Sequence, residues 1–448
     1  GGAFAWMPDG ERLLVKVVPE GRGPAPEPPR VPLGPAVQET SGDRSPVRTY
    51  QDLLSSPYDE RLFEHLATAQ LVLCDPRDGS TRAVGAAGIL TSFEPSPDGS
   101  SVLVERLRRP FSYVMSWRSF PSVVEVLDVD TGQLRFSYEI PAEENVPIGG
   151  VRTGPRSHAW QPTAPAPRVW VVALDGGDPK AQVDPRDRGR ALAAPFEQPA
   201  IELVRTEHRA RGLTWMREPT RVIVSEYDRD RRWTRSQLVD LADPAGPAVV
   251  LDDRSVNDRY GDPGRILTDL DERGGRVVRQ DGEWFYRAGS GESPGGARPF
   301  LDRQSLASGE VQRLWRCAPG SYESLAAVRA SSSDAAPRIL TVYETPEEPP
   351  NWRLRDLERD TIAPLTSFPD PTPQLRGITK QLVTYERDDG VPLSATLYLP
   401  AGYQEGTRLP LVVWAYPLEY NDPATAGQVR GSPYRFTRIG GISHLLLL

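Results

Sequence analysis

The sequence predicts an all-β propeller of about six to seven four-stranded blades, followed by the start of an α/β domain. Two turn motifs recur along the chain, each beside strand-like stretches, and successive copies lie roughly 45 to 65 residues apart, which is the length of a propeller blade. The composition agrees, because 46 Pro and 39 Gly are spread through the 448 residues rather than clustered. Such a distribution is typical of many short strands and turns.

The first motif is an aromatic or apolar residue, then Pro-Asp-Gly, then an alternating strand. Complete copies occupy Phe4–Gly10 and Phe93–Gly99, and degenerate copies begin at His158 and Leu213. The Asp-Gly pair supplies the residue with positive φ that a tight hairpin requires. Each copy therefore predicts a strand, a turn and a second strand.

The second motif is an apolar strand that ends in Asp, followed by a turn and another strand. We expect this Asp to cap the turn through backbone N–H groups rather than to take part in catalysis. The copies end at Asp75, Asp128, Asp240 and Asp302, and a related one leads to Asp360. Together the motifs predict a propeller domain over residues 1–372, with its first blade incomplete on the N-terminal side. A β-sandwich is the alternative, but such domains rarely exceed ~250 residues.

An insertion at about 19–67 interrupts the first blade. Its Pro-rich part, residues 19–36, cannot form regular structure, because proline removes backbone donors and fixes φ. Ser56-Pro57, followed by acidic residues, then predicts a helix start. The insertion is either a surface excursion or a cover for the propeller or the next domain. The predicted helix carries a short apolar stripe of Leu62, Phe63 and Leu66.

Composition and charge exclude several classes of function. A net charge of −8, without a block of Lys or Arg, argues against a nucleic-acid partner. No apolar run approaches the ~18 residues that span a bilayer, so no membrane partner is expected. The two cysteines, Cys74 and Cys317, are too few for a disulfide framework, and one incidental bridge between them is the alternative to two free thiols. The histidines show no metal-ligand spacing, so we expect no metal and no organic cofactor; they are His65, His158, His208 and His444.

The pattern changes from Ile378 onward. Residues 381–387 and 393–399 alternate as two strands around an Asp-Asp-Gly turn. The run 409–417 is then continuously apolar, as expected for a strand buried on both faces of an α/β sheet. A second domain is therefore predicted over residues 378–448.

This second segment resembles the opening part of the catalytic domain of prolyl-oligopeptidase-family serine peptidases. Three stretches are similar to the chloroplast-type glutamyl endopeptidases and their bacterial relatives: Ser45–Leu54, Trp414–Pro423 and Gly427–Pro433. With the propeller included, the resemblance covers essentially the whole chain. It implies an α/β-hydrolase domain and a serine endopeptidase that cleaves oligopeptides through an acyl-enzyme, with Glu as one preferred residue before the cleaved bond.

The resemblance assigns a role to one residue, Tyr416, and cleavage after Glu would also require a basic pocket. Tyr416 matches the tyrosine whose hydroxyl helps to hold the oxyanion, a role for which a neutral phenol is suited. Arg430 and Arg435 follow the apolar run, and a guanidinium there could bind a glutamate carboxylate with two hydrogen bonds. The alternatives are a tyrosine bonded locally at a strand end and two solvated arginines.

The expected catalytic triad is Ser, Asp and His in chain order, with the Ser in Gly-x-Ser-x-Gly. The resemblance places all three after residue 448, so the chain alone is expected to be inactive. One pattern match occurs at Ser293, and we reject it because Pro294 has no N–H to donate to an oxyanion.

Other functions remain open at this stage. Dipeptidyl and acylaminoacyl exopeptidases belong to the same family, but the pairs Glu143-Glu144 and Glu347-Glu348 lack the sequence context of a dipeptidyl-peptidase site. A propeller can also serve as a non-catalytic binding platform. Oligomeric state and compartment are not encoded in any motif; a bacterial cytoplasm or periplasm, or the chloroplast stroma for plant relatives, is compatible with the resemblance.

Overall fold

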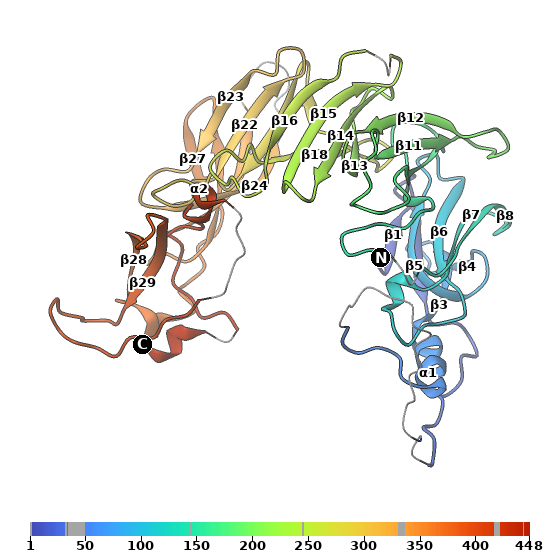
Figure 1. Ribbon diagram of the computed structural model, residues 1–448, viewed down its shortest axis with the longest axis horizontal. Coiled ribbons are helices and arrows are strands. Elements are labelled where there is room, and N and C mark those ends of the chain that lie inside the picture. The colour runs from blue at the N-terminus through green and yellow to red at the C-terminus, as the bar shows by residue number, and fades with distance from the viewer. Residues whose placement is uncertain are drawn as a thin grey trace. The chain divides into compact units, whose positions relative to one another are not determined.

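A computed structural model describes residues 2–31, 34, 50–143, 146–243, 246–329, 337–415, 422–441 and 443–448. The described chain is nearly all β, and its strands form successive antiparallel sheets, three of which have four strands (Figure 1). This confirms the predicted architecture of repeated blades. The chain divides into two compact units: the first contains residues 1–229, 238–248 and 268–277, and the second contains 230–237, 249–267 and 278–448.

The first unit begins with three blades. Blade one contains β1 (Phe4–Trp6), β2 (Leu13–Val17), β3 (Thr68–Cys74) and β4 (Thr81–Ala83). Blade two contains β5 (Gly88–Pro95), β6 (Ser101–Leu107), β7 (Ser122–Asp128) and β8 (Leu134–Ile140), and a short β3–β5 pairing joins it to blade one. Blade three contains β9 (Arg156–Trp160), β10 (Arg168–Ala173), β11 (Asp187–Leu192) and β12 (Ile201–Thr206).

Three further sheets continue the repeat. Blade four contains β13 (Arg209–Trp215), β14 (Arg221–Asp228), β15 (Trp233–Asp240) and β16 (Val249–Ser255). Blade five contains β17 (Arg265–Ile266), β20 (Gln280–Asp281), β21 (Trp284–Gly289), β22 (Phe300–Ser305) and β23 (Val311–Arg316). The strands β18 (Thr268–Leu270) and β19 (Arg276–Val278) form a separate two-stranded sheet. Blade six contains β24 (Tyr322–Arg329), β25 (Arg338–Glu344), β26 (Asn351–Asp356) and β27 (Thr361–Pro364).

Successive blades bury apolar side chains against each other. In the first unit, Leu14 and Leu71 of blade one pack with Val102 and Val104 of blade two in one cluster. Further clusters join blade two to blade three and blade three to blade four. In the second unit, one cluster joins Leu301 of β22 to Ile339 of β25. Face-to-face packing of consecutive sheets gives each β-meander a core that it could not form alone.

The Pro-Asp-Gly motifs form the predicted hairpin turns. Gly10 lies between β1 and β2 with φ 69°, and Gly99 lies between β5 and β6 with φ 72°. The Asp9 carboxylate accepts the backbone N–H of Glu11 at 2.8 Å, and the carboxylate of Asp98 accepts that of Ser100 at 3.0 Å. The motif thus combines a side-chain cap with a glycine in the left-handed region.

The prediction for Asp302 is wrong, whereas three other capping aspartates are confirmed. Asp75, Asp128 and Asp240 each accept a backbone N–H two residues farther along the chain at 2.9 Å. Asp302 instead lies inside β22, is buried and pairs with Arg313. The strand continues for three more residues, and the hydroxyl of Ser305 caps the turn.

The insertion in blade one contains the predicted helix. Helix α1 spans Pro57–Ala67, and the Ser56 hydroxyl accepts the N–H of Asp59 at 3.2 Å. Phe63 packs edge-on against the rings of Phe111 and Phe120 of the same unit. Residues 19–31 form no helix or strand, while 32–33 and 35–49 lie outside the described residues.

After blade six, the chain forms the expected hairpin but not the expected buried strand. Strands β28 (Thr379–Glu386) and β29 (Pro392–Leu399) pair around Gly390, which has φ 83°. Residues 409–415 form no regular structure, and Leu411 is 78% exposed. A strand buried on both faces needs a neighbouring strand and two covering layers, and the described residues supply none of these to this run.

The remaining helical elements are short: η1 (Trp117–Ser119), η2 (Pro373–Leu375), α2 (Pro423–Ala426) and η3 (His444–Leu447). None of the helices in the described ranges is long and apolar enough to cross a membrane.

Candidate functional site

The segment that carries the predicted arginines packs on blade five and its preceding loop. The side chain of Gln428 donates to the Asp258 carboxylate at 2.9 Å and accepts the N–H of Arg259 at 2.6 Å. The N–H of Val429 donates to the hydroxyl of Tyr260 at 2.8 Å, and the Val429 side chain is buried. These contacts fix the backbone of residues 428–429 within the second unit.

Arg430 lies in a small group of charged side chains. Arg430 as a whole is exposed, but its guanidinium is partly buried. This partial burial and the positive charge of the neighbouring Arg259 lower the pKa of the guanidinium, whereas the negative charge of Glu292 raises it. Burial raises the pKa of Glu292, whose carboxylate accepts the N–H of Gly431 at 3.1 Å. The guanidinium groups of Arg259, Arg430 and Arg435 therefore all interact electrostatically with the Glu292 carboxylate.

Arg435 is held against blade six. Its guanidinium donates to the hydroxyl of Tyr322 at 2.6 Å and lies 4.2 Å from the centre of that ring. The next residue, Phe436, is buried, and its N–H donates to the Glu344 carboxylate at 3.0 Å. Arg435 thus contacts β24 and Arg430 lies beside the loop between β21 and β22, and both guanidinium groups interact electrostatically with Glu292.

Tyr416 lies outside the described residues, so its predicted place at an oxyanion hole stays a prediction. Ser293, rejected as a nucleophile, lies in the loop between β21 and β22. Its hydroxyl donates to the carbonyl of Gly296 at 2.6 Å, and no helix follows it. The rejection of this serine is confirmed, because a nucleophile needs a strand-to-helix turn and an adjacent N–H.

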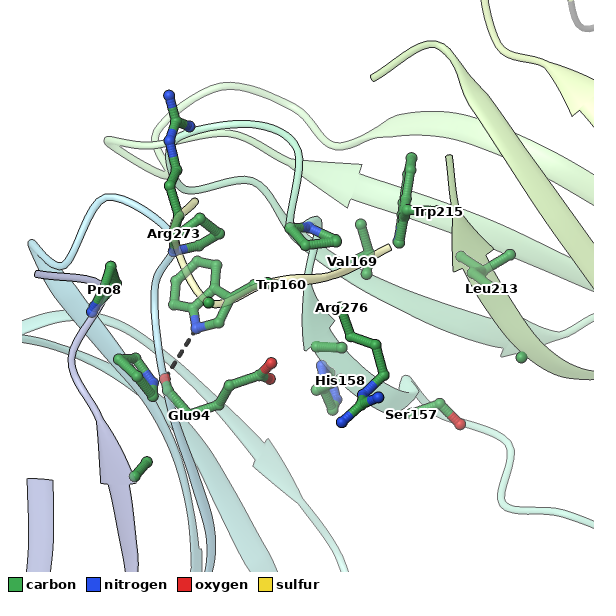
Figure 2. Close-up of a pocket in the computed structure, with 18 of the residues that line it drawn as sticks. Pro8, Glu94, Ser157, His158, Trp160, Val169, Leu213, Trp215, Arg273 and Arg276 are labelled. Carbon is green, nitrogen blue, oxygen red and sulfur yellow. Dashed lines mark hydrogen bonds between the residues drawn. The ribbon is translucent and has the colours of Figure 1, made fainter. Parts of the chain in front are cut away.

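The first unit contains a cavity of about 720 Å³ that no sequence motif indicated (Figure 2). Its walls come from β1, β5, β9, β10, β13 and the β18–β19 turn, which belong to different blades. Four tryptophans line it: Trp6, Trp160, Trp170 and Trp215. Pockets of this size, mainly apolar with a few polar groups, are typical of small-molecule sites.

Two ionisable groups at the cavity have shifted pKa values. Burial raises the pKa of Glu94. Burial and the neighbouring Arg168 lower the pKa of His158 to about 3, and Nδ1 of His158 accepts a hydrogen bond from Arg168 at 3.2 Å. His158 is therefore a neutral part of the wall at physiological pH.

The part of the chain that the structure describes contains no candidate metal-binding site. Within those residues, no three His, Cys, Asp or Glu side chains come together in a way that could hold a metal ion.

Sequence comparison relates the chain to named peptidases. It is 37% identical over 467 aligned residues to a probable chloroplastic glutamyl endopeptidase of Oryza sativa subsp. japonica, an alignment covering 100% of this chain and 49% of that protein. The corresponding protein of Arabidopsis thaliana is 35% identical, with 100% and 48% covered. The chain is a relative of the glutamyl endopeptidases. It spans about half the length of the curated relatives that it matches.

Comparison with solved structures gives a lower similarity than the sequence comparison does. The acylaminoacyl peptidase of Pyrococcus horikoshii is 13% identical with a TM-score of 0.45, over 91% of this chain and 52% of that one. No model of a known protein family matches the chain. The relationship to glutamyl endopeptidases therefore depends on the sequence identity, which confirms the resemblance inferred from the motifs.

Two groups of the site region were not found from the sequence. Arg259 lies far from Arg430 along the chain and is brought near it only by the docking of residues 428–429. Glu94 lies inside the Pro-Asp-Gly motif Phe93–Gly99, where the neighbouring residues predicted only the end of a strand. A single sequence contains no local signal for either, because both depend on contacts between distant segments.

Proposed function

We propose that this chain is the propeller and the opening of the hydrolase domain of a serine endopeptidase that cleaves oligopeptides through an acyl-enzyme. The observation that carries the proposal is the 37% identity to a glutamyl endopeptidase, which extends over the whole chain rather than over the blades alone. The proposed domains are residues 1–372 and 378–448. Peptides would reach the catalytic domain past the blades, so large folded proteins should be poor substrates.

In this proposal, the exposed apolar run 409–415 becomes a strand of the hydrolase sheet in a protein as long as the relatives. Leu411, Val413 and Trp414 are all more than 70% exposed. Exposed apolar groups that are adjacent in one run usually mark a surface that another part of a protein covers. Tyr416, two residues after Trp414, would then lie at the end of that strand and donate its O–H to the oxyanion.

The proposed specificity for Glu depends on Arg430. The guanidinium groups near Glu292 suit a substrate carboxylate, because a guanidinium binds a carboxylate with two parallel hydrogen bonds, and among them Arg430 is exposed and follows the apolar run. Arg435 has a different proposed role: it holds residues 435–436 against blade six through Tyr322. Arg430 would therefore select the substrate, and Arg435 would position the segment.

Labelling with a fluorophosphonate probe tests the enzyme class. The protein expressed from its natural gene should be labelled, and a Tyr416→Phe variant should lose about 10²-fold or more in kcat, as for loss of one oxyanion donor. A natural protein that is neither labelled nor able to cleave peptides would overturn the proposal and favour a non-catalytic binding platform.

The proposed specificity for Glu is tested by measuring the cleavage of two matched peptides, which differ only in having Glu or Gln before the cleaved bond. The Arg430→Gln variant should lose the preference for Glu, whereas Arg435→Gln should keep it. Equal cleavage of both peptides by the unsubstituted protein would overturn the proposed specificity for Glu but not the proposed peptidase activity. Release of only dipeptides or acylated residues from peptide ends would replace the endopeptidase with an exopeptidase.

A further inference from the structure

The connection between β16 and β17, residues 256–264, brings one arginine next to the segment that carries Arg430. The backbone N–H of Arg259 donates to the side-chain carbonyl of Gln428 at 2.6 Å, and Gln428 in turn donates to the Asp258 carboxylate at 2.9 Å. Both sides of this contact lie in the second unit. Two hydrogen bonds therefore set the position of Arg259 relative to residue 428.

The connection itself is braced from within. The guanidinium of Arg254 donates to the carbonyl of Asp258 at 2.9 Å and pairs with the Asp262 carboxylate at 2.9 Å. The Asp258 carboxylate also accepts the N–H of Gly261 at 3.1 Å, and Asp262 accepts that of Gly264 at 2.9 Å. A connection held in this way places its side chains before a ligand arrives, which reduces the entropy lost on binding.

The guanidinium of Arg259 is held in place but has no protein partner. Among the described residues, Arg259 forms no ion pair and no side-chain hydrogen bond. Its Nε is buried without an acceptor, whereas its two terminal nitrogens are not enclosed. A buried N–H that lacks an acceptor costs stability, and the terminal N–H groups remain available to an acceptor supplied by a ligand.

The charges around Arg259 indicate what kind of ligand this is. Partial burial and, after it, the charge of Arg259 lower the pKa of Arg430, so two cations have been brought close together. The Glu292 carboxylate accepts the N–H of Gly431 at 3.1 Å, and it forms no ion pair with the part of the chain that the structure describes. Like charges disfavour each other, and an anion shared between them removes that cost.

We propose that Arg259, on a connection between propeller blades, is a second specificity-determining residue, which binds the carboxylate of a substrate glutamate together with Arg430. The inference rests on the proposed cleavage after Glu and deepens it. A carboxylate has two oxygens that can each accept several hydrogen bonds, so two guanidinium groups can share it. Recognition of Glu then depends on the propeller as well as on residues 428–431.

The cleavage of the matched Glu and Gln peptides by the protein expressed from its natural gene tests this role. Arg259→Gln should lower kcat/KM for the Glu peptide by about tenfold or more, as for loss of a charge-assisted hydrogen bond, mainly through a higher KM. The Gln peptide should be cleaved as before. Arg259→Lys, which keeps the charge, should retain part of the preference for Glu.

Calorimetric titration with N-acetyl-Ala-Glu and N-acetyl-Ala-Gln gives a second measurement that needs no catalysis. Both probes have a free terminal carboxylate, so their difference in affinity reports the side chain alone. Arg259→Gln and Arg430→Gln should each reduce this difference by about tenfold or more. The double variant should lose less than the product of the two effects, because both residues bind the same carboxylate.

Arg265→Gln is the matched control, since Arg265 is an exposed arginine six residues farther along, in β17. It should keep the unsubstituted preference, and circular dichroism checks that every variant keeps its strands. An unchanged preference in Arg259→Gln would overturn the inference and leave the peptidase and the role of Arg430 intact. Equal losses in Arg259→Gln and Arg265→Gln would also overturn it, because they would indicate general charge attraction. A protein that is not labelled but still prefers N-acetyl-Ala-Glu through Arg259 would overturn the peptidase and keep the carboxylate site.

Discussion

Blade five and the chain after blade six both contain strongly apolar stretches, but only blade five buries them. Leu301 in β22 is fully buried between β21, β23 and the core shared with blade six. Leu411, in an equally apolar run, is 78% exposed and belongs to no strand. The difference shows that apolar sequence specifies a strand only where partner strands and a covering layer are supplied.

The same contrast holds for charged pairs. In blade six, Arg355 makes two hydrogen bonds to Glu323 at 2.7 and 2.5 Å, and the Glu323 side chain is only 1% exposed. In the β28–β29 hairpin, Arg387 also makes two hydrogen bonds to Asp389, but both side chains are more than half exposed. Similar geometry therefore has different energetic consequences, because water screens only the second pair.

The largest expected effect comes from breaking the buried pair. Arg355→Ala leaves the carboxylate of Glu323 buried beside the Thr341 hydroxyl alone, and we expect the free energy of unfolding to fall by about 3–5 kcal/mol. Arg387→Ala should leave chemical denaturation unchanged. Equal effects of the two substitutions would contradict the contrast between blade and hairpin.

A pair of leucines gives the next largest effect. Leu301→Ala should lower the free energy of unfolding by about 2–5 kcal/mol, because it creates a cavity in the core between blades five and six. Leu411→Ala, the same chemical change on an exposed side chain, should alter it by less than about 0.5 kcal/mol. Urea denaturation of both variants measures the difference, and a large loss for Leu411→Ala would show that the apolar run is packed in solution.

Burial in the blades should also make stability depend on pH through His158. The pKa of His158 is about 3 in the folded chain and 6.5 for an unburied histidine, as in the unfolded chain. As the pH falls, the unfolded chain therefore binds the proton before the folded chain does. Its contribution to stability is therefore present above pH 6.5 and is lost progressively as pH falls toward 3, by about 1.4 kcal/mol per pH unit. Comparison of denaturation at pH 7 and pH 5 should show a smaller acid loss in His158→Gln. An identical pH dependence of variant and unsubstituted chain would contradict this.

Local features of the fold were predictable from the sequence. The Pro-Asp-Gly turns and helix α1 depend on neighbouring residues, such as Asp9 with Gly10 or Ser56 with Asp59, and both motifs form as predicted. Asp302 resembled the capping aspartates in sequence, but its partner Arg313 lies on the next strand, so β22 extends past it. The turn type there depends on strand pairing, which a local motif does not encode.

The candidate sites were less predictable for the same reason. Arg430 was found from the resemblance, but its neighbours Arg259 and Glu292 come from distant parts of the chain. Glu94 in β5 and Arg276 in β19, which both line the cavity, likewise come from distant parts of the chain. Contacts of this kind arise from the stacking of blades, whereas the motifs report only the hairpins within each blade.

Hydrogen exchange of the chain, read by mass spectrometry, tests the contrast between blade and apolar run most directly. The account predicts slow exchange for the amides of β22, which are paired on both sides, and exchange at the rate of an unstructured peptide for residues 409–415. Protection of residues 409–415 comparable to that of β22 would contradict it, because the apolar run would then already be a paired strand.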